Sequence, residues 1–234
     1  MKTLGLIGGM TWHSSVDYYR LINEGVQARL GGLSSAALLL LSVDFGPIEE
    51  MQGRGDWKGL GRTMAEAARR LEAAGAEGLV ICANTMHRLA DDVSAAVRIP
   101  LIHIVDATAS AVKRGGLETV GLLGTRYTME MDFYRGRLER DHGLKVLVPD
   151  EPGRTLVHDI IFREFGRGLV REESRRVYVD VIGDLIKRGA EGVILGCTEI
   201  PLLIKPPDSP VPVFDTTALH AAAAVDFALS GTSL

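Results

Sequence analysis

The sequence predicts an α/β protein made of two similar halves with parallel sheets. Short apolar segments that end in glycine alternate with helical patterns along the 234 residues, as is typical of parallel strands covered by helices. The chain also repeats itself: GAEGLVICANT (75–85) aligns without a gap on GAEGVILGCTE (189–199). Two further blocks recur in the same order, LGLIGGMT (4–11) with VGLLGTRY (120–127), and IPLIHIVDATA (99–109) with VPVFDTTA (211–218). A duplication explains all three.

The first half is predicted to hold four strands. Apolar runs of strand length, bounded by glycine, proline or polar residues, place them at 4–7, 38–43, 79–82 and 99–105. A helix is expected to begin near Ser14, because Ser14 and Asp17 have the spacing of a capping box. Helical periodicity over 60–74, closed by Gly75, predicts a second helix.

The second half repeats this plan. We expect strands at 120–123, 145–148, 193–195 and 213–214, and helices over 129–141, 153–165, 171–188 and from about 217. The duplication divides the chain into residues 1–112 with 213–234, and residues 113–212.

The composition argues against several classes of protein. With 46% hydrophobic and 24% charged residues and a net charge of −4, the chain is expected to be an ordinary soluble protein without a basic tract for nucleic acid. The longest apolar run, Ala36–Leu41, is far shorter than the roughly 20 residues that cross a bilayer. Two cysteines form no disulfide framework, so free thiols in a reducing cytoplasm are expected.

Two features that could suggest cofactors are interpreted otherwise. The Gly8-Gly9 turn has neither the spacing of a dinucleotide site nor that of a P-loop. Asp44, Asp106 and Asp215 follow strands without metal-ligand spacing, so we expect structural roles such as helix capping and no metal site.

Cys197 is the main candidate for chemistry. It directly follows a buried strand, and ligands of parallel sheets bind at the carboxyl ends of strands. A thiol at a helix start can have a lowered pKa and act as a base or a nucleophile; a lone cysteine is also a common core residue. In the repeat, Ala83 aligns with Cys197 and Cys82 with Gly196, so the two thiols are not equivalent.

Asn84 and Thr85 follow the equivalent strand of the first half. Their amide and hydroxyl groups suit an α-carboxylate or an ammonium group, and they suit helix capping equally well. His87, one turn further, is expected to be structural.

Five motifs together carry a family resemblance: GLIGGMTWHSS (5–15), YYRLINEG (18–25), ANTMH (83–87), GTRYTM (124–129) and GCTEI (196–200). With them the chain resembles the aspartate/glutamate racemase family, in its amino-acid racemase branch, over essentially its whole length. The resemblance implies two Rossmann-like domains related by pseudo-twofold symmetry, a ligand cleft between them, a homodimer and no cofactor. It also implies two cysteines on opposite faces of the substrate α-carbon, one removing a proton and the other returning one.

The chain departs from that pattern at one position. Cys197 matches the family's second cysteine, but Ala83 stands where the first belongs, and alanine cannot transfer a proton. Some relatives have threonine there. Neighbouring strand residues point to opposite faces, so Cys82 is expected to face the flank of the sheet and not the ligand.

The resemblance also implies a set of ligand contacts. They are Met10, Thr11, Gln52, Ala83, Asn84, Thr85, Tyr127, Thr198 and Glu199. Aspartate-specific relatives hold the distal carboxylate with basic residues, and Arg54, Arg163 and Arg167 do not fall in that register, so we interpret them as solvated surface arginines.

The sequence therefore predicts a cofactor-independent amino-acid racemase of the aspartate/glutamate type, with Cys197 as its thiol acid/base. Two alternatives stay open. One is a protein that binds an amino acid or dicarboxylate with little turnover. The other is a one-thiol decarboxylase or isomerase of the arylmalonate decarboxylase type.

Overall fold

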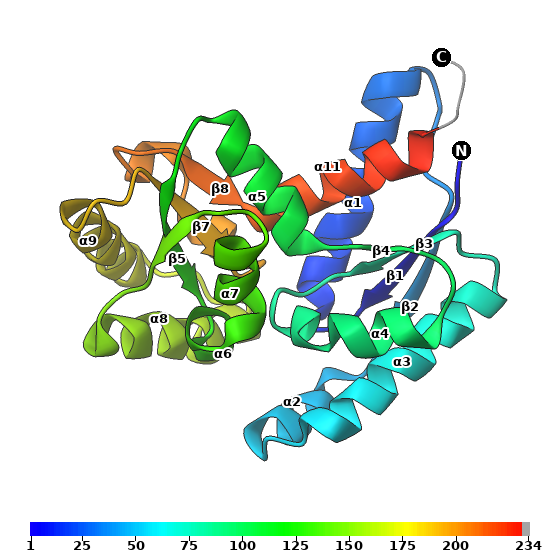
Figure 1. Cartoon of the computed structure of the whole chain (residues 1–234), viewed down its shortest axis with the longest axis horizontal. Helices are drawn as coiled ribbons and strands as arrows, with labels where there is room; N and C mark the ends of the chain where they lie inside the picture. The colour runs from blue at the N-terminus through cyan, green and yellow to red at the C-terminus, as the bar shows by residue number, and fades with distance from the viewer. Residues whose placement is uncertain (231–234) are drawn as a thin grey trace. The chain divides into compact units, whose positions relative to one another are not determined.

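Two four-stranded parallel sheets form the framework of the chain in the computed structural model, which describes residues 1–230 (Figure 1). The first sheet has the order β2-β1-β3-β4, from β1 (Leu4–Gly8), β2 (Leu38–Ser42), β3 (Gly78–Ile81) and β4 (Leu101–Ile102). The second has the order β6-β5-β7-β8, from β5 (Thr119–Gly124), β6 (Lys145–Leu147), β7 (Gly192–Gly196) and β8 (Val213–Asp215). The two orders match strand by strand, and the predicted fold class is confirmed.

Each sheet belongs to its own compact unit. The first unit comprises Met1–His103 and resumes at His220, and the second comprises Ile104–Leu219. Residues 104–112 and 213–219, which the sequence analysis assigned to the first half, lie in the second unit here, since β8 pairs with β7.

Helices cover both faces of the first sheet. Helix α1 (Trp12–Leu30) and the part of α11 (Thr216–Leu229) that belongs to this unit pack on the face that carries Leu4, Leu6 and Val80. Helix α3 (Trp57–Ala73) packs on the opposite face, against Ile7 and Ile81. This unit also contains α2 (Phe45–Gly53), the 3₁₀ turn η1 (Thr85–Leu89) and α4 (Ala90–Ala96).

The second sheet is covered in the same way. Helices α5 (Ile104–Arg114) and α7 (Asp132–Arg140) pack against Val120, Leu122 and Ile194. Helices α8 (Glu151–Arg163) and α9 (Glu172–Lys187) pack against Leu123, Val193 and Leu195. The remaining short elements are α6 (Arg126–Glu130), η2 (Phe165–Arg167), α10 (Ile200–Leu203) and η3 (Pro206–Asp208).

Several predicted boundaries are wrong. Helix α1 begins at Trp12 and not near Ser14, because the Ser14 hydroxyl donates to the Thr11 carbonyl at 2.8 Å and does not cap the helix. The strand expected over 99–105 shrinks to β4, and α5 starts at Ile104. The helix expected over 129–141 is largely α7, which begins later, at Asp132, because residues 126–130 form the separate short helix α6. Helices α2 and α4 were not predicted.

The GAEG repeat has a structural cause that is the same in both units. Glu77 donates its N–H to the Thr3 carbonyl at 2.8 Å and accepts the Thr3 N–H at 2.7 Å through its carboxylate. Glu191 makes the same pair of hydrogen bonds with Thr119, at 2.9 and 2.8 Å. These glutamates tie the start of the third strand of each unit to the start of the first.

Within residues 1–230, no helix combines the length and the apolar character needed to span a membrane.

Candidate active site

The predicted site residues lie just after the carboxyl ends of strands. In the first unit, Met10 and Thr11 follow β1, and residues 83–85 follow β3, the strand paired with β1. In the second unit, Tyr127 follows β5, and residues 197–199 follow β7, whose Gly196 pairs with Gly124. Because parallel strands end at the same edge of a sheet, each unit gathers its own set there. Gln52 lies on α2, which follows β2, and is buried.

Cys197 and Glu199 form a buried polar contact in the second unit. The thiol donates to Glu199 Oε2 at 3.0 Å, and the Thr198 hydroxyl donates to the same oxygen at 2.6 Å. All three residues are buried. A carboxylate that accepts the thiol proton provides a path by which Cys197 can become a thiolate.

The pKa of Cys197 moves in the direction opposite to the sequence expectation. Burial and then the negative charge of Glu199 raise the pKa well above 9, although the backbone N–H groups of Glu199 and Ile200 lower it. The helix α10 has only four residues, and its N–H groups do not outweigh the burial of the sulfur and the charge of Glu199. In the absence of ligand, the thiol is therefore protonated at neutral pH.

Cys82 and Ala83 point to opposite faces of the first sheet, as the strand period predicts. Cys82 is fully buried in the cluster formed with α1 and α11, which includes Tyr18 and Ile22. Burial raises the pKa of this thiol far above its usual range. Ala83 belongs to the other cluster, together with Met10. Cys82 thus lies on the face of the first sheet opposite to that of Ala83 and Met10.

Three histidines support the turn after β3: His87, which the sequence analysis expected to be structural, and His103 and His220, which it did not detect. His87 is hydrogen-bonded through Nδ1 to the Ala83 carbonyl at 2.8 Å, and its ring lies 4.7 Å from that of His103 and 5.4 Å from that of His220. His220 contacts the Tyr18 hydroxyl at 2.7 Å. Burial lowers the pKa of both His87 and His220, so both rings are neutral. These histidines are far apart in the sequence, so no local pattern could have revealed that their rings lie together.

His158 is a further residue that no pattern in the sequence pointed to. Its Nδ1 accepts the Arg126 N–H at 3.2 Å, and its ring meets the Tyr127 ring edge-on at 6.2 Å. Burial, then the charge of Arg126, lowers its pKa. A neutral imidazole therefore lies beside the predicted ligand residue Tyr127.

The three aspartates that follow strands, Asp44, Asp106 and Asp215, make hydrogen bonds within the protein, as expected for structural residues. Asp44 accepts the Gly46 N–H at the start of α2, and Asp215 accepts the N–H groups of Thr217 and Ala218 at the start of α11. Asp106 instead binds Arg137 and His142.

Across the described part of the chain, His, Cys, Asp and Glu residues nowhere form a group of three suited to a metal ion. Of the arginines considered for a distal carboxylate, Arg163 pairs with Asp159 on the surface at 3.2 Å.

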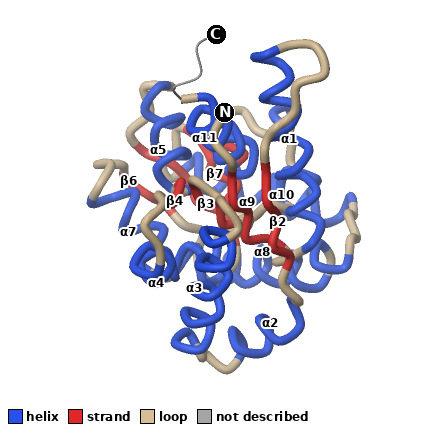
Figure 2. The backbone as a smooth tube through the Cα atoms, turned by 90° about the vertical axis from the view of Figure 1, so that its right-hand side faces the viewer, coloured by secondary structure: helices blue, strands red, loops and turns tan. Residues whose placement is uncertain are grey.

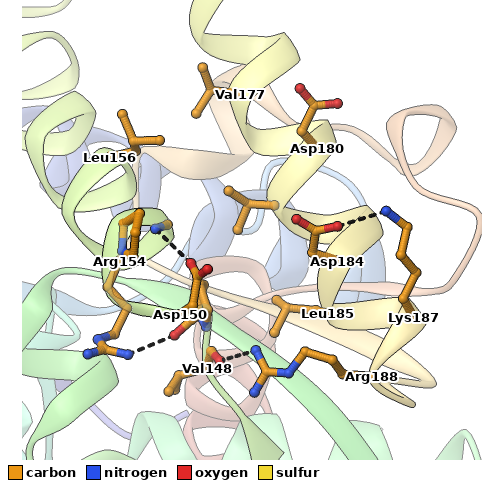
Figure 3. A pocket seen from close by; sticks show the side chains of 14 residues that line it. Val148, Asp150, Arg154, Leu156, Val177, Asp180, Asp184, Leu185, Lys187 and Arg188 are labelled. Carbon is orange, nitrogen blue, oxygen red and sulfur yellow. Dashed lines mark hydrogen bonds and ion pairs between the residues drawn. The ribbon is translucent and has the colours of Figure 1, made fainter.

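A pocket of about 730 Å³ lies between α8 and α9 in the second unit (Figure 3). Leu156, Val177 and Leu185 line it together with charged residues, among them the Asp184–Lys187 pair at 2.8 Å. None of the predicted ligand residues lines this pocket.

Residues 7–224 match the family of Asp/Glu/hydantoin racemases. The chain belongs to this family. It is similar to a candidate Asp/Glu racemase from Yersinia pestis, at 54% identity and a TM-score of 0.92, covering 98% of this chain and all (100%) of that one. It is also similar to an aspartate racemase homologue from Pyrococcus horikoshii OT3, at 37% identity and a TM-score of 0.84, covering 97% and 99% of the two chains.

A third relative is a racemase of broad specificity. The broad-specificity amino-acid racemase RacX of Bacillus subtilis is 21% identical over 168 residues, which is 70% of each chain. Membership of the family supports a racemase-type isomerase.

Proposed function

We infer that this protein moves a proton at the α-carbon of a small acidic amino acid without a cofactor, with Cys197 as its thiol acid/base. The observation that carries this inference is the buried contact of 3.0 Å between the Cys197 thiol and the Glu199 carboxylate. The contact joins a thiol that can act as a base toward the α-carbon to a carboxylate that can accept the thiol proton, in a desolvated site.

Each step conserves its protons. Cys197 passes its proton to Glu199 and becomes a thiolate, which removes the α-proton of the substrate. The ammonium group of an amino acid, lying beside the thiol, favours this ionisation because a nearby positive charge lowers a thiol pKa. Thr198 already donates to Glu199, so its lone pairs are left to accept from the ammonium group. Asn84 and Thr85 hold the α-carboxylate.

Ala83 sets the stereochemical outcome. Its methyl group cannot donate a proton where the racemase family places its other cysteine, so Cys197 exchanges the α-proton mainly with retention of configuration. A second candidate function rests on the same residue: one thiol is enough to protonate a carbanion that forms by loss of CO₂.

Proton NMR in deuterium oxide tests this function. The α-proton signals of L- and D-aspartate and of L- and D-glutamate are followed, and loss from one enantiomer without inversion is expected. Cys197→Ser should abolish the exchange, and Cys82→Ala, which alters the thiol on the other face of the sheet, should not. Ala83→Cys should add inversion.

Two outcomes would contradict this assignment. If none of the four amino acids loses its α-proton while calorimetry still shows binding, the protein is a binder. Release of CO₂ from a substituted malonate, without exchange of any amino acid, would assign a decarboxylase.

A further inference from the structure

The pocket between α8 and α9 takes no part in the function proposed above. It has a volume of about 730 Å³ and is lined by 14 residues from α8, α9 and the loop that follows β6. Helices α8 and α9 lie side by side in Figure 1 and in Figure 2, and both belong to the second unit. Pockets for small molecules have volumes of about 300–1,000 Å³, so this one has room for such a ligand. We call it the α8–α9 pocket.

Apolar side chains form much of the wall of the α8–α9 pocket. On α9, Val177, Val181 and Leu185 recur every four residues, so they lie in one row along the helix. Leu156 lies across from this row on α8 and is 49% exposed (Figure 3). The row and Leu156 together offer a surface on which the apolar body of a ligand would lose its contact with water.

Hydrogen bonds fix the loop at one end of the pocket. The Asp150 carboxylate accepts an N–H of the first turn of α8 at 2.9 Å. Arg154 on α8 donates to the Pro149 carbonyl, and Arg188 at the end of α9 donates to the Val148 carbonyl, both at 2.8 Å. Because these bonds tie both helices to the same loop, the pocket is preformed, and a ligand does not have to order it.

The cations that line the pocket already have partners. Arg154 pairs at 2.8 Å with Glu130, which does not line the pocket. Lys187 pairs with Asp184 at 2.8 Å, and Arg188 is held by the backbone carbonyl described above. An anionic ligand would therefore have to compete for each cation with a group that the protein itself supplies.

Asp180 differs from the other charged residues of the pocket. Within residues 1–230 its carboxylate makes no hydrogen bond and no ion pair, and the cation whose charge acts on it, Lys187, is bound to Asp184. Asp180 lies one turn before Asp184 on α9, beside the apolar row (Figure 3). The pocket thus leaves one carboxylate for a ligand, next to an apolar surface.

We propose that the α8–α9 pocket binds a small organic amine. The protonated nitrogen pairs with Asp180, and the apolar body lies on the row of α9 and on Leu156. A neutral apolar ligand would cover the Asp180 carboxylate without giving it a partner, which costs free energy. A carboxylate ligand would be repelled by the same group. The proposal does not involve Cys197 and is independent of the proposed function.

A small molecule fits this pocket better than a protein does. A standard protein interface takes about 20–30 residues from each partner, whereas 14 residues line this pocket. The single carboxylate without a partner, Asp180, matches the single charge of a monoamine.

A methyl NMR titration tests this site with three probes of similar shape, phenethylamine, phenethyl alcohol and phenylacetate. We expect the amine to shift the methyl signals of Val177 and Val181, and to bind about 3–5-fold more tightly than the alcohol, as an exposed ion pair allows. Phenylacetate should bind more weakly than the alcohol. Phenylacetate that binds as tightly as the amine, or an amine that leaves these signals unchanged at millimolar concentration, would overturn the proposal.

Variants of α9 show whether Asp180 carries the selectivity. Asp180→Asn should remove the advantage of the amine over the alcohol, and Glu173→Gln, at an exposed position of the same helix outside the pocket, should keep it. Val177→Trp should fill the pocket and abolish binding. Its control is Val179→Trp, because Val179 is 38% exposed on α9 and does not line the pocket.

Two results with these variants would refute the site. One is an amine that keeps its advantage in Asp180→Asn, and the other is binding that is lost in a folded Val179→Trp. Circular dichroism checks the fold of each variant. Because Asp180 is exposed, Asp180→Asn decides the question even where Val177→Trp fails to fold.

Discussion

Acidification should destabilise the first unit through its buried histidines. His220 contacts the Tyr18 hydroxyl through Nδ1 and the Ile102 carbonyl through Nε2, both at 2.7 Å. The carbonyl accepts only, so Nε2 carries the proton and Nδ1 accepts from the tyrosine. A second proton on the ring would reverse the bond with Tyr18, whose hydroxyl would then accept, and would leave a charged ring in a buried site. Burial therefore lowers the pKa of His220 to about 4.

The magnitude follows from proton linkage. The ordinary histidine pKa of about 6.5 applies to the unfolded chain, which therefore takes up the proton first as the pH falls. The stability is fully present above pH 6.5 and is lost between about 6.5 and 4. For His220 alone the loss is about 2 kcal/mol at pH 5 and about 3 kcal/mol at pH 4. His87, whose pKa is also lowered, adds to the loss.

Urea unfolding at pH 7, 6 and 5 measures this loss. His220→Gln keeps one donor and one acceptor but does not titrate, so its free energy of unfolding should depend less on pH than that of the wild type. His13→Gln, at the partly exposed start of α1, is the control and should keep the full dependence. Equal stability of the wild type at pH 7 and pH 5, or identical pH dependence in His220→Gln and the wild type, would refute the reasoning.

Three further variants test the site and the packing. Glu199→Gln should lower the pKa of Cys197 because the neighbouring charge is lost, and alkylation of the thiol should then occur at lower pH. The same variant should slow α-proton exchange about 10²–10⁴-fold, because the proton acceptor is lost. Unchanged exchange would contradict the role of Glu199. Gly78→Ala should cost about 1–3 kcal/mol in urea unfolding, since its methyl group would overlap the Phe227 ring. Gly183→Ala, within α9 and with no atom within 4 Å of the new methyl group, should instead stabilise by about 0.5–1 kcal/mol; the opposite order of these two variants would show that the packing differs.

Sequence periodicity predicted the strands well because parallel strands are buried on both faces. The central strands β1 and β3 appear in this way, as uninterrupted runs whose residues are all buried. The same rule failed at 99–105, where Ile104 and Val105 continue the apolar run but begin α5. An apolar run that crosses from a strand into a buried helix carries no local mark of the boundary.

The candidate site was only partly accessible from the sequence. The position of Cys197 after a strand and the family resemblance pointed to Cys197, Thr198 and Glu199 as candidates. They did not give the direction of the thiol pKa, which depends on burial and then on a carboxylate 3.0 Å from the sulfur. The contact between Tyr18 and His220 joins residues 202 positions apart, so only the fold reveals it.

The duplication separates what the fold requires from what the chemistry requires. Gly75 and Gly189 both have positive φ, at 98° and 99°, and Glu77 and Glu191 both tie together the starts of two strands. These shared residues lie at the amino ends of β3 and β7, where the sheet is assembled. At the carboxyl ends of these strands the two copies differ: Ala83 in the first unit occupies the position that Cys197 occupies in the second. Identity between the halves is therefore a guide to the framework, and the difference between them marks the residues to which we assign the proposed chemistry.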